Sequence, residues 1–225
     1  SFLCSMSREA AFEHGDVSLR FCERETDYAH IDEDMTDRQV WPTAMAFGRY
    51  LCDNRQLVAG RGVVDLGSGT GVAGLIAAKV GARKVFLTDL AKAVDLMQQN
   101  IEINSQEAVA TALPLAWGDK AAAEDICAND VSVVLGCDIV YQHPESVNVA
   151  LADTIFALLR KAPAGVAIFA YQPRDGSEFM DGAFFDRMTA LGFKTTKQPL
   201  SPWDDVWDDA CETRFVVTFA RSSMM

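Results

Sequence analysis

The sequence lacks the features that mark membrane, secreted or metal-binding proteins. No apolar run approaches the ~20 residues that a helix needs to cross a bilayer. The opening stretch SFLCSMSREAAFEHGD has neither the basic start nor the continuous apolar core of a signal peptide. The six cysteines show no CxxC spacing, and the three histidines show no metal-ligand spacing. We therefore expect a reduced intracellular protein, in the cytoplasm with the nucleus left open, without a metal or a membrane segment.

Positive charge is also scarce. Lysine and arginine number 20 against 32 aspartates and glutamates, which gives a formal net charge of −12. Nucleic-acid-binding proteins usually carry a basic face, and no such face is visible, so we expect no nucleic-acid partner. The charge favours a basic partner, such as a protein segment rich in lysine or arginine. An equally simple interpretation is that it keeps the protein soluble.

The 225 residues contain no repeat, low-complexity tract or long linker, which predicts a single domain over 1–225. An extension over 1–40 precedes the core over 41–225. The extension contains a predicted hairpin at 11–23 and an acidic, solvated stretch at 32–37. A helix is expected from Trp41-Pro42 to about residue 53, with proline in its first turn.

Strand-like and helix-like segments alternate along the core. Apolar, β-branched runs predict strands at 62–66, 84–88, 112–117, 131–137, 165–171 and 214–220. Periodic patterns predict helices at 72–80, 91–104, 146–161 and 179–191. This alternation predicts an α/β fold with a doubly wound, mostly parallel sheet covered by helices on both faces.

A glycine-rich loop joins the first core strand to its helix, in the stretch VVDLGSGTGVAG at 63–74. It contains one G-x-G-x-x-G, which is weak evidence for a nicotinamide cofactor and leaves a dehydrogenase open. However, Asp65 lies inside the strand end, where dinucleotide-binding folds usually place an apolar residue. The whole D-x-G-x-G-x-G pattern resembles motif I of class I methyltransferases, which bind S-adenosylmethionine and release S-adenosylhomocysteine. The residues expected to bind this cofactor are Asp65, Gly67, Ser68, Gly69 and Gly71.

The chemistry of these residue types suits that cofactor. Glycines let the backbone pass close to the methionine portion, and a carboxylate complements its ammonium and sulfonium charges. Asp89 ends the second core strand, where an acid usually accepts hydrogen bonds from both ribose hydroxyls.

Several separated segments resemble methyltransferase family 16, whose members have seven β-strands and in many cases methylate lysine in non-histone proteins. The resemblance is carried by the hairpin and by VWPTA, VVDLGSGTG, FLTDL, LAWGD and LGCDIVYQ, and it covers roughly 12–195. It implies that Trp41, Trp117 and Cys137 contact the cofactor, with core packing as the alternative for the two tryptophans. Asp37-Arg38-Gln39 stands where the family often has a glycine, and the acidic segment 199–212 matches no part of the family.

The stretch LGCDIVYQ ends the fourth strand with an acid and a phenol, Asp138 and Tyr141. Ligands of doubly wound sheets bind at the carboxyl edge where strand order reverses, which places this tip beside the glycine loop. The resemblance implies catalytic and substrate-binding roles for both residues. Asp138 would attract and orient a lysine ammonium, and Tyr141 would hydrogen-bond the amine or present its ring to the cation. The alternatives are a helix cap for Asp138 and simple packing for Tyr141.

Two further residues are weaker candidates. Tyr171 ends the fifth strand, and His143 falls in a turn expected to be exposed.

The sequence thus predicts a monomeric S-adenosylmethionine-dependent methyltransferase that modifies a lysine of a protein. A small-molecule or protein N-terminal methyltransferase and a catalytically silent binding module remain open. The acidic segment with Trp203 and Trp207 is expected near the mouth of the site.

Overall fold

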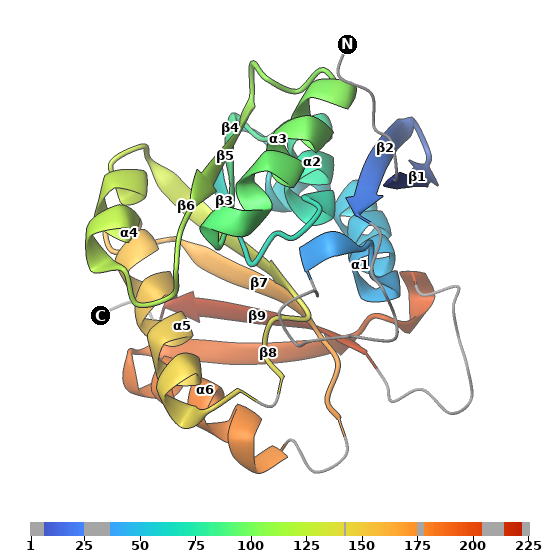
Figure 1. Ribbon diagram of the computed structural model, residues 1–225. Helices are drawn as coiled ribbons and strands as arrows, with labels where there is room; N and C mark the ends of the chain where they lie inside the picture. The colour runs from blue at the N-terminus through green and yellow to red at the C-terminus, as the bar shows by residue number, and fades with distance from the viewer. Residues whose placement is uncertain (1–6, 25–36, 142, 175–177, 204–213, 222–225) are drawn as a thin grey trace.

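The computed structural model describes residues 7–24, 37–141, 143–174, 178–203 and 214–221. Its main feature is a seven-stranded sheet in the order β5-β4-β3-β6-β7-β9-β8 (Figure 1). The strands are β3 (Gly62–Leu66), β4 (Lys84–Asp89), β5 (Ala110–Pro114), β6 (Val131–Cys137), β7 (Val166–Tyr171), β8 (Phe193–Pro199) and β9 (Phe215–Arg221). All pairs among the first five are parallel, and β9 is antiparallel to both β7 and β8. The predicted doubly wound, mostly parallel sheet is confirmed.

Helices cover both faces of this sheet, as Figure 1 shows. One face carries α1 (Pro42–Asp53), α2 (Val72–Lys79) and α3 (Val94–Ile103), and the other carries α4 (Lys120–Cys127), α5 (Glu145–Leu158) and α6 (Glu178–Ala190). The side chains of the central strand β3 alternate between the two faces of the sheet. Because helices cover both faces, the strand is buried throughout. Val63 packs among the first three helices, whereas Val64 and Leu66 pack among the other three.

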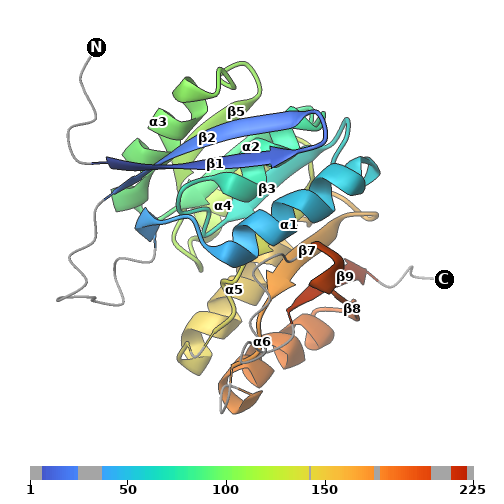
Figure 2. The ribbon, with the colours of Figure 1, turned by 90° about the vertical axis from the view of Figure 1, so that its right-hand side faces the viewer.

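The predicted N-terminal hairpin is present as β1 (Ser7–His14) and β2 (Val17–Arg24), which lies over α2 and α3 (Figure 2). Four of its apolar side chains, those of Phe12, Val17, Leu19 and Phe21, are buried in the core that these helices share. The buried Asn100 of α3 links the hairpin to the glycine loop. Its Nδ2 donates to the carbonyls of Cys22 and Thr70, and its Oδ1 accepts from the Cys22 amide at 2.7 Å. The hairpin therefore supports one side of the site.

Three elements differ from the sequence-based expectation. The third core strand, β5, runs from Ala110 to Pro114, so the predicted bounds of 112–117 were wrong; residues 115–116 form no regular structure and 117–118 form a turn. Helix α4 was not predicted; Asp119 caps it by accepting from the Ala122 amide at 3.1 Å. Strand β8 was not predicted because it is an edge strand with six exposed residues in succession, which leaves no apolar pattern to detect.

Within the part of the chain described, no helix combines the length and the apolar character that crossing a bilayer would require.

Candidate functional site

The glycine loop follows β3, and Asp65 lies beneath it. The Asp65 side chain is almost fully buried, and its Oδ2 accepts from the Ser68 hydroxyl at 2.6 Å and from the Gly74 amide at 2.9 Å. Gly74 lies in the first turn of α2, so the carboxylate also satisfies a free amide at that helix N-terminus. Burial raises the pKa of Asp65 to about 6, although both hydrogen bonds lower it. The contacts of Asp65 thus brace the loop from below.

Gly67 brings this loop against the segment that follows β6. Its φ of +59° is the left-handed region that favours glycine. A Cβ at this position would lie 2.8 Å from Ile139 Cγ2 and 3.3 Å from Trp117 Cζ2. Because β3 and β6 are paired, with Leu66 opposite Gly136, the glycine loop and the D-x-x-Y segment emerge side by side. The structure therefore brings the predicted cofactor and acceptor residues to one edge of the sheet.

Asp89 at the end of β4 contacts the same loop. Its Oδ2 accepts from the Gly69 amide at 2.8 Å, and its Oδ1 accepts from the Leu90 amide at 2.7 Å. Burial raises the pKa of Asp89, and the nearby carboxylate of Asp37 raises it further. Each carboxylate oxygen retains a lone pair for a second donor, so these contacts leave capacity for ribose hydroxyls.

Asp37 lies against the glycine loop, where the sequence did not predict it. The prediction that it belongs to a solvated stretch was wrong, because Asp37 is buried and its Cα lies 3.6 Å from where a Gly69 Cβ would be. Its Oδ1 lies 3.9 Å from Lys92 Nζ, and this oxygen accepts no hydrogen bond among the described residues. The sequence signal that could have identified Asp37 was its position, because the family often has a glycine there. Residues 32–36 lie outside the described part of the chain.

The three residues that the family resemblance added lie in different surroundings. Trp41 precedes α1 and is 46% exposed. Trp117 is half-buried, with its ring against Gly67 and at right angles to the His143 ring. Cys137 ends β6, and burial and the adjacent Asp138 carboxylate raise the pKa of its thiol well above the ordinary value. Trp117 is the tryptophan that the structure brings to the glycine loop.

On the acceptor side, Asp138 and Tyr141 surround a cation that belongs to the protein itself. Asp138 adopts a positive φ of 55°, and its amide donates to the Ala170 carbonyl at 2.8 Å. Its Oδ2 accepts from Arg174 Nη2 at 2.7 Å, and the Arg174 guanidinium lies 5.1 Å from the centre of the Tyr141 ring. Burial raises the pKa of Asp138, whereas Arg174 lowers it. Arg174 was not predicted as a site residue, although it lies three residues after the end of β7.

The two weaker candidates have structural contacts. Tyr171 is buried on the α6 face of the sheet, and its hydroxyl donates to Asp181 Oδ2 at 2.9 Å. His143 is half-buried, so its expected exposure was wrong, and its ring packs 4.4 Å from Tyr141 and 5.4 Å from Trp117. His143 therefore supports the two aromatic rings of the site.

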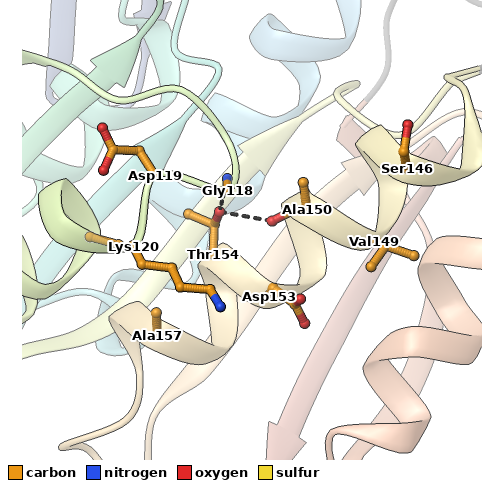
Figure 3. A pocket seen from close by; sticks show the side chains of 10 residues that line it. Gly118, Asp119, Lys120, Ser146, Val149, Ala150, Asp153, Thr154 and Ala157 are labelled. Atoms are coloured by element: carbon orange, nitrogen blue, oxygen red, sulfur yellow. Dashed lines mark hydrogen bonds between the residues drawn. The ribbon is translucent and has the colours of Figure 1, made fainter.

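A separate hollow lies between α4 and α5, shown in Figure 3. Its volume is about 180 Å³, below the several hundred Å³ of typical cofactor sites. Thr154 Oγ1 stands in it, accepting from the Gly118 amide and donating to the Ala150 carbonyl. None of the three predicted site aspartates lines it, so this hollow is distinct from the candidate site.

Trp203 lies away from that site as well. Its ring packs edge-on against Tyr50, and its Nε1 donates to Asp53 Oδ2 at the C-terminal end of α1. A helix of 12 residues is about 18 Å long, so Trp203 and Trp41 lie near opposite ends of it. The remainder of the acidic segment expected near the site mouth, residues 204–212, lies outside the described residues.

The fold and this site define a class I methyltransferase. Magnesium protoporphyrin IX methyltransferase from Synechocystis, crystallised with S-adenosylhomocysteine and separately with S-adenosylmethionine, superposes with a TM-score of 0.55 in both structures. In the S-adenosylhomocysteine structure it is 17% identical and covers 80% of this chain and 82% of that one. At this identity the likeness concerns the fold.

The family follows from the sequence comparison. Residues 25–190 match the model of the lysine methyltransferase family, methyltransferase family 16, and the chain belongs to it. Mouse histone-arginine methyltransferase METTL23 is 27% identical over 197 residues, covering 82% of this chain and 74% of that protein. EEF1A lysine methyltransferase 3 from Xenopus tropicalis is 33% identical over 105 residues, covering 46% and 45%. The chain is a methyltransferase, and its cofactor is S-adenosylmethionine, as the glycine loop predicted.

Proposed function

We propose that this protein methylates a cationic side chain of a protein substrate, with lysine as the first candidate. The observation that carries the proposal is the Arg174 cation bound between Asp138 and Tyr141, next to the glycine loop. A pair of groups that holds one cation at this edge of the sheet suits an acceptor that is itself a cation.

The residues on the other side of this edge fit the cofactor. The absence of a side chain at Gly69 leaves room beside the Asp37 backbone, and Asp37 places a buried carboxylate oxygen without a hydrogen-bond partner among the described residues. Asp89 and Asp37 together favour a positively charged ligand, since two carboxylates in a buried site repel each other. When bound, S-adenosylmethionine supplies a methyl group on a positively charged sulfur. We assign its binding to Asp65, Asp89, the glycine loop, Trp41, Trp117 and Cys137.

A lysine acceptor has to lose a proton before its nitrogen can be methylated. At neutral pH this costs about 4–5 kcal/mol, because the ordinary pKa of lysine is about 10.4. Asp138 holds the ammonium in position. Burial raises the pKa of this carboxyl, which makes its ionised form a better proton acceptor. Tyr141 presents its ring to the cation.

Arginine is the second candidate acceptor. The group that Asp138 and Tyr141 hold is a guanidinium, and METTL23, which aligns with most of this chain, is named a histone-arginine methyltransferase. A guanidinium is planar and fits a carboxylate and an aromatic face together, whereas an ammonium is a compact point charge. Small-molecule and protein N-terminal acceptors, and a silent binding module, are the outcomes that would displace both candidates.

The charge of the chain supports a basic partner. A net charge of −12 attracts a substrate segment rich in lysine or arginine and accelerates its encounter with the enzyme. We further propose that the protein acts as a cytoplasmic monomer built from one domain.

Isotopic labelling tests the proposed function. The protein is incubated with a proteome and S-adenosylmethionine carrying a labelled methyl group, and mass spectrometry identifies the modified residue. Asp138→Asn should abolish most of the label, whereas Asp153→Asn, which removes a half-buried ion pair with Arg187, should leave it unchanged. Labelled lysine supports the first candidate and labelled arginine the second. Label in small molecules or N-termini alone, or no label despite cofactor binding, would refute the proposal.

A further inference from the structure

Arg174 is the hydrogen-bonded cation of the acceptor-side carboxylate, and the buried Arg214 acts on the same carboxylate only through its charge. Arg174 lies in the segment after β7, and its Nη2 donates to Asp138 Oδ2 at 2.7 Å while its guanidinium faces the Tyr141 ring. The side chain of Asp138 is 13% exposed and that of Arg174 34% exposed. The Asp138 carboxylate and the Tyr141 ring belong to the D-x-x-Y segment assigned above to the acceptor.

This ion pair differs from the other arginine pairs of the described residues. The carboxylates paired with Arg55, Arg83, Arg160 and Arg187 are between 32% and 89% exposed. Exposed pairs of that kind contribute little because water and salt screen them. The Asp138–Arg174 contact is shielded and charge-assisted, so it holds its geometry more firmly.

We propose that Arg174 is a specificity-determining residue that occupies the position of the acceptor cation, so that a substrate side chain must displace it to reach Asp138 and Tyr141. This inference rests on the proposed function, in which those two residues bind the acceptor. Two cations at a single carboxylate repel each other, and one ring face accommodates one of them. Arg174 and the acceptor are therefore alternatives at this position.

The occupancy of Arg174 lowers the apparent affinity of every acceptor. Only the fraction of molecules in which Arg174 has left can bind, so the apparent dissociation constant rises by the inverse of that fraction. If Arg174 is displaced in about one molecule in ten or fewer, its removal should tighten acceptor binding about tenfold or more. A basic substrate segment with several contacts overcomes this competition, whereas an isolated cation does not.

The test uses Arg174→Ala and, in case that variant is unstable, Arg174→Gln, with Arg187→Ala as the matched control. Arg187 pairs with Asp153 on the helices α5 and α6, away from Asp138. Methylguanidinium serves as a small cationic probe, and its binding is measured by nuclear magnetic resonance at pH 8, since burial raises the pKa of Asp138 and a high pH favours its carboxylate. The expected result is at least about tenfold tighter probe binding in both Arg174 variants than in the wild type or Arg187→Ala.

Two further measurements complete the test. Adding Asp138→Asn to Arg174→Ala should remove the gained probe binding, and KM for the protein acceptor should fall in the single variants while cofactor affinity stays unchanged. Unchanged probe binding, or a higher KM with a lower kcat, would overturn the proposal and make Arg174 part of the acceptor-binding machinery. The probe measurement needs no turnover. A gain of probe binding without any labelled protein would thus refute the proposed function and leave the position of Arg174 supported.

Discussion

Replacing Asp89 by alanine should weaken cofactor binding more than it weakens the fold. The substitution removes the acceptor of the Gly69 amide at 2.8 Å and of the Leu90 amide at 2.7 Å, together with the expected ribose contacts. Charged hydrogen bonds contribute about 1.5–3 kcal/mol, so the dissociation constant should rise about 10- to 150-fold. The free energy of unfolding should fall by only about 1–2 kcal/mol, because water reaches the two amides once the carboxylate is gone.

Calorimetric titration with S-adenosylhomocysteine measures the first quantity, and urea denaturation measures the second. Asp89→Asn retains one carbonyl oxygen for Gly69 but lacks the charge, so its affinity should lie between those of the wild type and Asp89→Ala. Asp95→Ala removes an exposed acid from the first turn of α3 and serves as the control. An affinity of Asp89→Ala within about threefold of the wild type, with the fold intact, would show that Asp89 only supports the loop.

Three other predictions concern the loop, its buried acid and the acidic segment. The pKa of Asp65 is raised to about 6 from 3.8. In the cofactor-free protein, the contribution of Asp65 to the free energy of unfolding is therefore most favourable below pH 3.8 and is lost as the pH rises through 6. The difference in unfolding free energy between wild type and Asp65→Asn should therefore change by up to about 3 kcal/mol between pH 4 and 7.5, and a constant difference refutes this. Gly67→Ala should cost more stability than Gly15→Ala, because both have φ near +60° but only the first meets a neighbour, Ile139; equal losses would contradict it. Neutralising the four aspartates of 204–209 should raise KM for the protein substrate and flatten its salt dependence, and a salt profile identical to wild type would remove the segment from substrate binding.

The sequence predicted the sheet well because buried parallel strands are short, apolar and bounded by polar residues. The bounds of β3 and β6 were predicted as the structure has them. Strand β8 was not predicted. It is an edge strand whose last six residues are exposed, so the stretch FKTTKQP shows no apolar alternation.

The candidate site was predictable only as far as residues follow strand ends. Asp89 ends β4 and Asp138 directly follows β6, and parallel strands bring their carboxyl ends to one edge, so this shared edge follows from topology. The partners of these acids do not follow from topology. Asp37 approaches Gly69 through a tertiary contact, and Arg174 reaches Asp138 from the segment after β7 across 36 residues of sequence. Such contacts depend on side-chain packing that no local pattern encodes.

The central claim is that Asp138 acts on the acceptor rather than on the cofactor or the fold. Single-turnover methyl transfer by Asp138→Asn, with a labelled methyl donor and the identified protein substrate, tests it most directly. Losing a charge-assisted contact of about 2–4 kcal/mol should lower the rate about 30- to 1000-fold. Cofactor affinity should change little, and Asp153→Asn should transfer methyl groups at the wild-type rate. A near-wild-type rate for Asp138→Asn would contradict the account, because asparagine can replace aspartate as a structural hydrogen-bond partner but not as a charge.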